Sequence, residues 1–169
     1  GKMLNRQTCQ GYADNSTWAR GQAWAIYGYT MIYRETQDKK FLDAAIGLTN
    51  FFLENKNLPK DHIPYWDFNA NQEGFKPDFK YDANLYKESP RDASAAAIVS
   101  SALLELCNYV PEKRNDYINA SKNILKSLSS NQYLAEAGSN NNFLLKHSTG
   151  SLPHNQEIDV PLVYADYYY

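Results

Sequence analysis

Two long runs in the sequence carry apolar, aromatic or small residues on nearly every side of a helix, from Thr17 to Thr36 and from Ala93 to Leu104. A helix that is apolar all round is buried, whereas a surface helix keeps one polar face. Both runs are therefore predicted to be interior helices, the first over 17–36 and the second over 92–109. One face of the first is formed mainly of small residues that would let another helix approach closely: Gly21, Ala25, Gly28 and Ile32.

A helix with one solvated face is predicted after each interior helix. Over 39–55 and over 112–130, apolar residues recur at helical spacing on one side only. Short motifs repeat with the same order: Asp14–Ser16 resembles 92–94, and Lys40–Ala45 resembles 116–121, at an offset of about eighty residues. The chain therefore alternates interior and surface helices.

Two long connections separate the helix pairs. Residues 56–91 contain four prolines and one aromatic segment, Ile63–Phe68, which is either a wall of a pocket or the patch that fixes the loop. Connections of this length inside a compact domain are uncommon and are often functional. A second loop is predicted over 134–158, and a fifth helix is predicted to open near Asp159–Pro161, with proline in its first turn.

Interior helices, outer amphipathic helices and long loops at one end are typical of an all-α fold, the (α/α)6 barrel or toroid. Five helices do not close such a ring. The chain also begins abruptly and stops in the middle of a helical pattern at Tyr169. We therefore expect residues 1–169 to be one partial domain that supplies about half of the ring and lacks its N-terminal half.

Composition excludes several classes of partner. The formal net charge is −2 and the basic residues are scattered, which argues against nucleic acid as a partner. There is no apolar run long enough for a membrane span. Cys9 and Cys107 lack the spacing of a zinc site, and we expect them to be small, buried and unpaired, although one disulfide is the alternative. The sequence does not decide between a cytoplasmic and a periplasmic location.

The start of the first helix carries an unusual group of side chains. Arg20 and Trp24 are four residues apart and share one face, with Trp18 one turn earlier. A guanidinium can bind a carboxylate through two hydrogen bonds, and an indole offers a flat surface to a sugar ring. A helix N-terminus also favours an anion. The alternative is that the tryptophans fill the core and that Arg20 forms a structural ion pair.

Three residues are candidates for helix N-caps because their side chains offer an oxygen to the free N–H groups of a first turn. Asp14 or Ser16 is expected to cap the first helix, and Asp92 the third. These assignments leave the aspartates with structural roles.

At Gln10–Trp24, with the letters QGYADNSTWARGQAW, the sequence resembles the unsaturated glucuronyl hydrolases of glycoside hydrolase family 88. PYWDF at Pro64–Phe68, RDASAAAI at Arg91–Ile98 and HSTGSLPHN at His147–Asn155 continue the resemblance. It spans the whole chain and lies in the C-terminal half of the family's (α/α)6-barrel domain. The related unsaturated rhamnogalacturonyl hydrolases look similar, but they usually carry Asn-Gly where this chain has Gln22 and Ala23.

The resemblance implies a polysaccharide-degrading hydrolase. Its substrate is a lyase-generated oligosaccharide, of glycosaminoglycan type, that ends in a 4,5-unsaturated uronic acid. An aspartic acid protonates the double bond at C4, water adds at C5, and the hemiketal collapses to release the shortened sugar, without a metal or an organic cofactor. The two important family aspartates lie upstream of Gln10, so no catalytic residue is assigned in this chain, neither Asp14 nor Asp67 nor Asp92.

What the resemblance carries over to this chain is substrate binding. Gln10, Arg20 and Trp24 match family positions that line the pocket for the unsaturated uronate, and Trp18 lies beside them. Arg20 is expected to bind polar groups of the sugar and Trp24 to stack on it.

A second set of candidates follows from a family motif for sulfate. Some members bind a sulfate through two serines spaced S-x-x-S and a nearby lysine; Ser148 and Ser151 match the serines, while Pro153 stands near the lysine position. The alternative is that both serines cap turns in this loop. His154 is a further candidate at the rim.

Two other functions stay open at this point. One is an unsaturated rhamnogalacturonyl hydrolase, and the other is a non-catalytic fragment that binds sugar or serves as a scaffold. The expected partners are an unsaturated uronyl oligosaccharide and the missing half of the chain's own domain.

Overall fold

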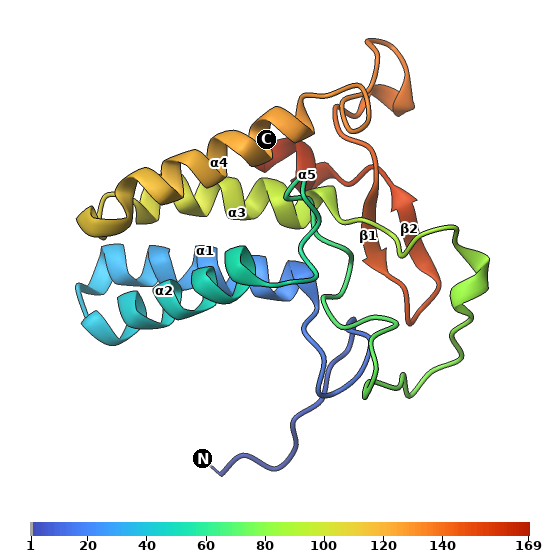
Figure 1. Ribbon diagram of the computed structural model, residues 1–169, viewed down its shortest axis with the longest axis horizontal. Helices are drawn as coiled ribbons and strands as arrows, with labels where there is room; N and C mark the ends of the chain where they lie inside the picture. The colour runs from blue at the N-terminus through green and yellow to red at the C-terminus, as the bar shows by residue number, and fades with distance from the viewer. Residues whose placement is uncertain (1) are drawn as a thin grey trace.

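The computed structural model describes residues 2–169 and is mainly helical (Figure 1). A two-stranded antiparallel hairpin lies at one end of the helices. The elements are α1 (Ala19–Thr36), α2 (Lys39–Glu54), α3 (Ala93–Leu106), α4 (Arg114–Leu128), β1 (Ser148–Ser151), β2 (Gln156–Val160) and α5 (Val163–Tyr168), with short 3-10 turns at Ala83–Leu85, Pro111–Lys113 and Asn140–Asn142.

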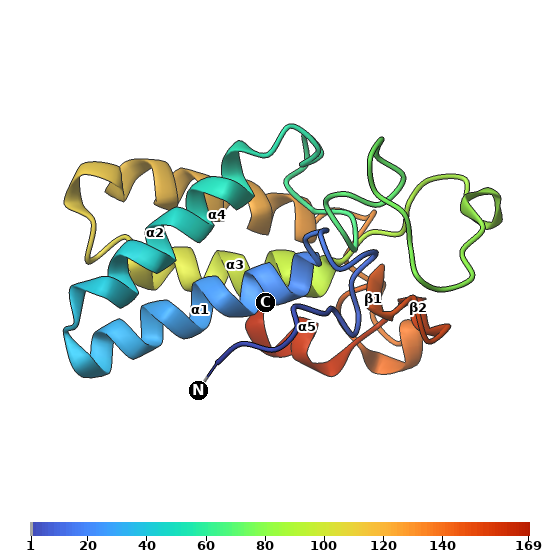
Figure 2. The ribbon, with the colours of Figure 1, turned by 90° about the horizontal axis from the view of Figure 1, so that it is seen from below.

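The helices form two layers. Helix α3 packs between α1 and α5, α2 packs on α1, and α4 packs on α3. Figure 2 shows α1, α3 and α5 together on one side, with α2 and α4 on the other. The predicted alternation of inner and outer helices is confirmed. Helices α1 and α3 run in the same direction, and their N-terminal ends point toward the hairpin and the long loop of residues 56–91 (Figure 1).

Helix α3 forms the centre of the core because its side chains are small. Residues 93–99 are completely buried, and four of these seven residues are alanines. Small side chains let α1 and α5 approach the α3 backbone on two sides. The polar residues within this helix are paired: the Ser100 hydroxyl lies 2.8 Å from the Ser121 hydroxyl of α4. The predicted interior position of this helix is confirmed.

Helix α1 is buried on one side only, which corrects the prediction that it is interior all round. Tyr29, Met31 and Ile32 are 36–37% exposed, and the space beside Gly28 is empty. Among residues 2–169, α1 packs against α2, α3 and α5, and none of these helices covers the small face that contains Gly28.

The predicted N-caps are correct for α3 and wrong for α1. The Asp92 carboxylate accepts hydrogen bonds from the backbone N–H groups of Ser94 and Ala95. At α1 the N-cap position is held by Trp18, whose side chain makes no capping bond. Ser16 lies two residues before that position. Its hydroxyl accepts a 2.9 Å hydrogen bond from the Ala13 backbone N–H and donates a 2.7 Å hydrogen bond to Asp67, a residue far along the chain.

The predicted loop over 134–158 contains the hairpin, which the sequence analysis did not anticipate. Strand β1 pairs with β2 with an irregular register beside Ser148. Asp159 and Val160 belong to β2, so α5 begins only at Val163 and the predicted helix start is wrong. The hairpin had no clear signal because β1 reads Ser-Thr-Gly-Ser, which lacks the branched and aromatic residues typical of strands.

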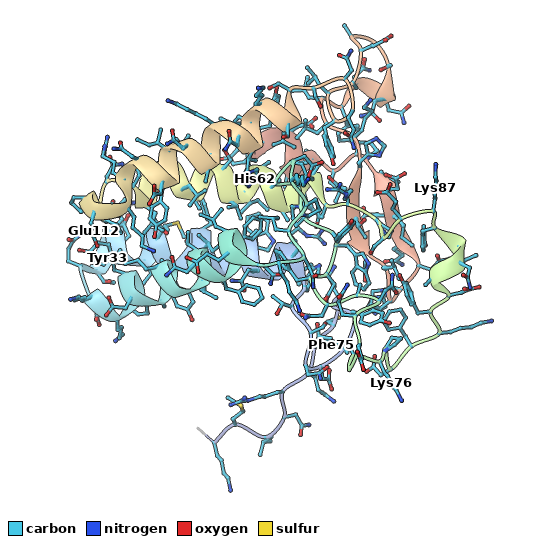
Figure 3. The ribbon with its side chains drawn as sticks, viewed as in Figure 1. Tyr33, His62, Phe75, Lys76, Lys87 and Glu112 are labelled. Atoms are coloured by element: carbon cyan, nitrogen blue, oxygen red, sulfur yellow. The ribbon has the colours of Figure 1, made fainter. Side chains whose placement is uncertain are left out.

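The segment Ile63–Phe68 fixes the long loop to the helices. Trp66 and Phe68 are fully buried, and isolated bridges join Asp67 to Trp18 and Tyr65 to Arg91. These contacts support the prediction that the segment is the patch that fixes the loop. The rest of the loop lies beyond the helix ends, where Figure 3 shows Phe75, Lys76 and Lys87 far from Tyr33 and Glu112 at the other end of the bundle.

Both cysteines are free: Cys107 is buried as predicted, but Cys9 is exposed. Within residues 2–169, no helix is long and apolar enough to cross a membrane. In the same part of the chain, no three His, Cys, Asp or Glu side chains gather in a way that could hold a metal ion.

Candidate substrate-binding site

The N-terminal end of α1 meets strand β1, and this junction brings most of the predicted binding residues together. Arg20 and Trp24 lie on the first two turns of α1, Trp18 lies at its N-cap, and Gln10 approaches from the preceding segment. The Gln10 side-chain amide donates a 3.1 Å hydrogen bond to the carbonyl of Gly150 in β1.

Arg20 lies at the centre of this junction and is only 3% exposed. Its guanidinium forms a 2.8 Å ion pair with the fully buried carboxylate of Asp92, the N-cap of α3. It also donates hydrogen bonds to the backbone carbonyls of Thr149 and Gly150. A charge buried this deeply is stable only when it is paired and hydrogen-bonded. Arg20 therefore joins α1 to α3 and to β1, and its direct contact with substrate remains a prediction.

Two aromatic rings enclose the guanidinium. Its central carbon lies 4.7 Å from the ring centroid of Trp18 and 5.4 Å from that of Tyr164 in α5. Both distances fall within the range of cation–π attraction. Both rings therefore contribute to the low exposure of Arg20.

Trp24 joins Arg20 to a cluster of half-buried rings between α1 and α5. Its ring centroid lies 6.1 Å from that of Tyr164 and 5.4 Å from that of Tyr168. Tyr27 continues the cluster, 5.2 Å from Tyr168. Flat rings with polar tips suit the mixed apolar and hydroxylated surface of a sugar. The cluster is therefore chemically suited to bind a carbohydrate.

Gly150 is held from both sides. Its carbonyl accepts hydrogen bonds from Gln10 and Arg20, while Glu157 of β2 lies across its Cα. A methyl group added at this position would lie 2.6 Å from the Glu157 Cβ and 2.4 Å from its carboxylate. The absence of a side chain at Gly150 therefore lets the two strands and the Arg20 side chain come together.

The two serines of the sulfate motif do not share a partner in this structure. Ser148 is completely buried, and its hydroxyl accepts a 3.1 Å hydrogen bond from the backbone N–H of Ser94 at the start of α3. The Ser151 hydroxyl lies 2.6 Å from Nδ1 of His154, the predicted rim residue, which is exposed. Their present contacts fit the structural alternative, and sulfate binding by this pair remains a prediction.

The three aspartates to which the sequence analysis assigned no catalytic role, Asp14, Asp67 and Asp92, have structural contacts. Asp14 is exposed and accepts a hydrogen bond from the Thr8 backbone. Burial raises the pKa of Asp92, while the Arg20 guanidinium and the bonds from Ser94 and the backbone oppose the shift. Burial also raises the pKa of Asp67, against hydrogen bonds from Tyr12, Ser16 and the 69–70 backbone. Neither buried carboxylate faces open space, as a proton donor to a substrate would.

Sequence reasoning missed Tyr164, which contacts both Arg20 and Trp24. Tyr164 contacts these residues because α5 packs beside the start of α1, although the two helices are more than a hundred residues apart in the sequence. The only available signal was the density of tyrosines at 164–169, which by itself does not distinguish a site from a core.

No family model matches the chain. An unsaturated glucuronyl hydrolase from Formosa agariphila is 49% identical over 169 residues, which are 100% of this chain and 38% of that protein. An unsaturated chondroitin disaccharide hydrolase from Streptococcus pneumoniae is 33% identical over 175 aligned residues, 100% of this chain and 39% of that protein. The chain thus spans about two fifths of the length of these relatives.

Solved structures show the same correspondence. The crystal structure of an unsaturated glucuronyl hydrolase specific for heparin superimposes with a TM-score of 0.86 at 48% identity, over 100% of this chain and 42% of that one. A mutant of the Streptococcus agalactiae enzyme, complexed with dGlcA-GalNAc6S, gives 0.78 at 33% identity, over 99% of this chain and 41% of that one. Over its whole length the chain is therefore a homologue of the unsaturated glucuronyl hydrolases, and its two-layered helical fold is that of part of their α/α toroid.

Proposed function

We propose that this chain forms the substrate-binding wall of an unsaturated glucuronyl hydrolase. The observation that carries the proposal is the junction of α1, α5 and β1, where the ring of Tyr164 lies beside both the Arg20 guanidinium and the ring of Trp24. The substrate would be an unsaturated uronyl oligosaccharide of glycosaminoglycan type. Homologues named for heparin and for chondroitin disaccharides support this class of substrate.

The reaction proposed for the complete enzyme is hydration of the C4–C5 double bond. A carboxylic acid donates its proton to C4, water adds at C5, and the resulting hemiketal opens and releases the shortened oligosaccharide. The role of this chain is to bind and orient the uronyl ring, which converts a bimolecular reaction into one between groups already in place. Trp24 would stack on the sugar and Gln10 would line the pocket.

The proton donor is proposed to come from the rest of the domain. Asp67 and Asp92 are buried and fully used by hydrogen bonds and an ion pair, and Asp14 accepts a bond from the backbone. In the complete hydrolase, this chain is joined to the remainder of the hydrolase domain. The half-exposed small face of α1 around Gly28 is proposed to contact that remainder.

The proposal is tested by the ultraviolet absorbance of the conjugated unsaturated uronate. The complete hydrolase is expected to abolish this absorbance on unsaturated heparin or chondroitin disaccharides. Activity confined to unsaturated galacturonyl-rhamnose would favour a rhamnogalacturonyl hydrolase instead. Binding of these sugars without loss of absorbance would show a non-catalytic sugar-binding protein.

Replacing Trp24 by alanine is expected to raise the KM of the complete hydrolase for its disaccharide about tenfold, which corresponds to ~1.4 kcal/mol of lost stacking. Tyr29→Ala is the matched control, because Tyr29 is an aromatic residue of the same helix whose ring instead stacks on Phe41 of α2. Steady-state kinetics on both variants provide the measurement. Equal KM values for the wild type and Trp24→Ala would exclude Trp24 from the binding surface.

A further inference from the structure

Among the rings of the candidate site, Tyr164 lies beside both Arg20 and Trp24. It lies on the first turn of α5 and is half-buried, with its ring centroid 5.4 Å from the Arg20 guanidinium and 6.1 Å from the ring of Trp24. Tyr164 therefore lies beside the two residues that are expected to bind the sugar.

The hydroxyl of the half-buried Tyr164 differs from those of two buried tyrosines, Tyr133 and Tyr117. Tyr133 uses its hydroxyl in a 2.9 Å hydrogen bond to Asp61, and the hydroxyl of Tyr117 is enclosed without a partner. In the part of the chain that the structure describes, the Tyr164 hydroxyl is neither hydrogen-bonded nor enclosed. It is therefore free to bond to a ligand.

The electrostatic surroundings keep this hydroxyl protonated. Burial raises the pKa of Tyr164, and although Arg20 acts in the opposite direction, the nearby carboxylates of Asp92 and Glu157 raise it further. At neutral pH the phenol is thus a hydrogen-bond donor.

We propose that Tyr164 is a substrate-binding residue whose hydroxyl donates a hydrogen bond to an oxygen of the uronyl sugar, with Arg20 as the positioning residue behind it. This inference rests on the proposed function and adds a specific residue of α5 to its site. In this arrangement Arg20 acts on the sugar through the ring of Tyr164, which reconciles its expected role with its burial.

Tyr164→Phe in the complete hydrolase is the decisive variant, because it keeps the ring over Arg20 and removes only the hydroxyl. The KM for the disaccharide that the wild type hydrolyses is expected to rise about three- to tenfold, the effect of one hydrogen bond, with a much smaller change in kcat and no change in Tm. Tyr167→Phe is the matched control: it lies on the same helix and is 79% exposed. Its KM should equal that of the wild type.

The possible outcomes distinguish a failure of the role of Tyr164 from a failure of the proposed function. An active wild type and a Tyr164→Phe variant with unchanged KM would overturn the role of Tyr164 and leave the proposed function standing. A lowered Tm with unchanged KM would show that the hydroxyl is structural, which also overturns the inference. A wild type without activity on any unsaturated uronyl disaccharide would overturn the proposed function, and the inference with it.

Discussion

Replacing Arg20 by alanine is expected to lower the free energy of unfolding of the complete hydrolase by about 3–5 kcal/mol. The substitution leaves the Asp92 carboxylate, which is completely buried, without its cation. It also removes the hydrogen bonds from Arg20 to the carbonyls of Thr149 and Gly150, so β1 loses its attachment to α1, and Gly150 keeps only the bond from Gln10. Because the hairpin would then shift relative to Trp24, we expect kcat/KM to fall about a hundredfold. Urea denaturation and steady-state kinetics provide the two measurements.

The double variant Arg20→Ala, Asp92→Ala is the control for the first prediction. Removing both partners of a buried pair leaves no unpaired charge, so the double variant should be more stable than the sum of the single losses implies. A single Arg20→Ala variant with wild-type stability and a raised KM would contradict the account. It would mean that the guanidinium faces the substrate and does not hold the hairpin.

Asp67→Ala is expected to lower the free energy of unfolding by about 3 kcal/mol, because each buried donor left without an acceptor costs ~1–3 kcal/mol. One carboxylate oxygen of Asp67 accepts from the Tyr12 backbone and from the Ser16 hydroxyl, and the other accepts from the Asn69 backbone. These bonds hold the segment before α1 against the long loop. Denaturation of the Asp67→Ala variant measures the effect, and a loss no larger than that of Asp14→Ala would contradict it.

The raised pKa of Asp67 predicts that the stability of the protein depends on pH. Burial raises the pKa of Asp67 above its ordinary value of 3.8, so the folded state holds this proton more tightly than the unfolded state. The contribution of this group to stability is therefore present below pH 3.8 and is lost as the pH rises through the raised pKa. Asp67→Asn should remove this part of the slope. Asp92 contributes a slope of the same sign, so some should remain.

The helices were predictable because their signals are local. The ends of α2 and α3 fall within a few residues of the predicted ones, and Asp92 caps α3 as expected from its position. The two-layer arrangement followed from one property, the difference between helices that are apolar all round and helices with a solvated face.

The predictions of local structure were wrong where a contact with a residue distant in the sequence determined that structure. Ser16 looked like an N-cap, but Asp67 is the acceptor of its hydroxyl. Strand β2 contains two residues with left-handed backbone conformations, Glu157 and Asp159, which no strand pattern would predict. The position of the hairpin depends on Arg20, whose hydrogen bonds to β1 span about 130 residues of sequence.

For the candidate site, the sequence predicted a set of binding residues but not their arrangement. Gln10, Trp18, Arg20 and Trp24 do come together at one junction. Helical spacing alone could not show that Arg20 would be covered by rings and paired with Asp92, because both Tyr164 and Asp92 come from other helices.

The measurement that tests the central claim most directly is a crystal structure of the complete hydrolase with a saturated uronyl disaccharide, which lacks the double bond and cannot be hydrated. The account predicts that the uronyl ring stacks on Trp24, with an oxygen within hydrogen-bond distance of the Tyr164 hydroxyl. A sugar bound elsewhere, such as in the cleft of about 380 Å³ between Leu85–Arg91 and Asp159, would contradict the account.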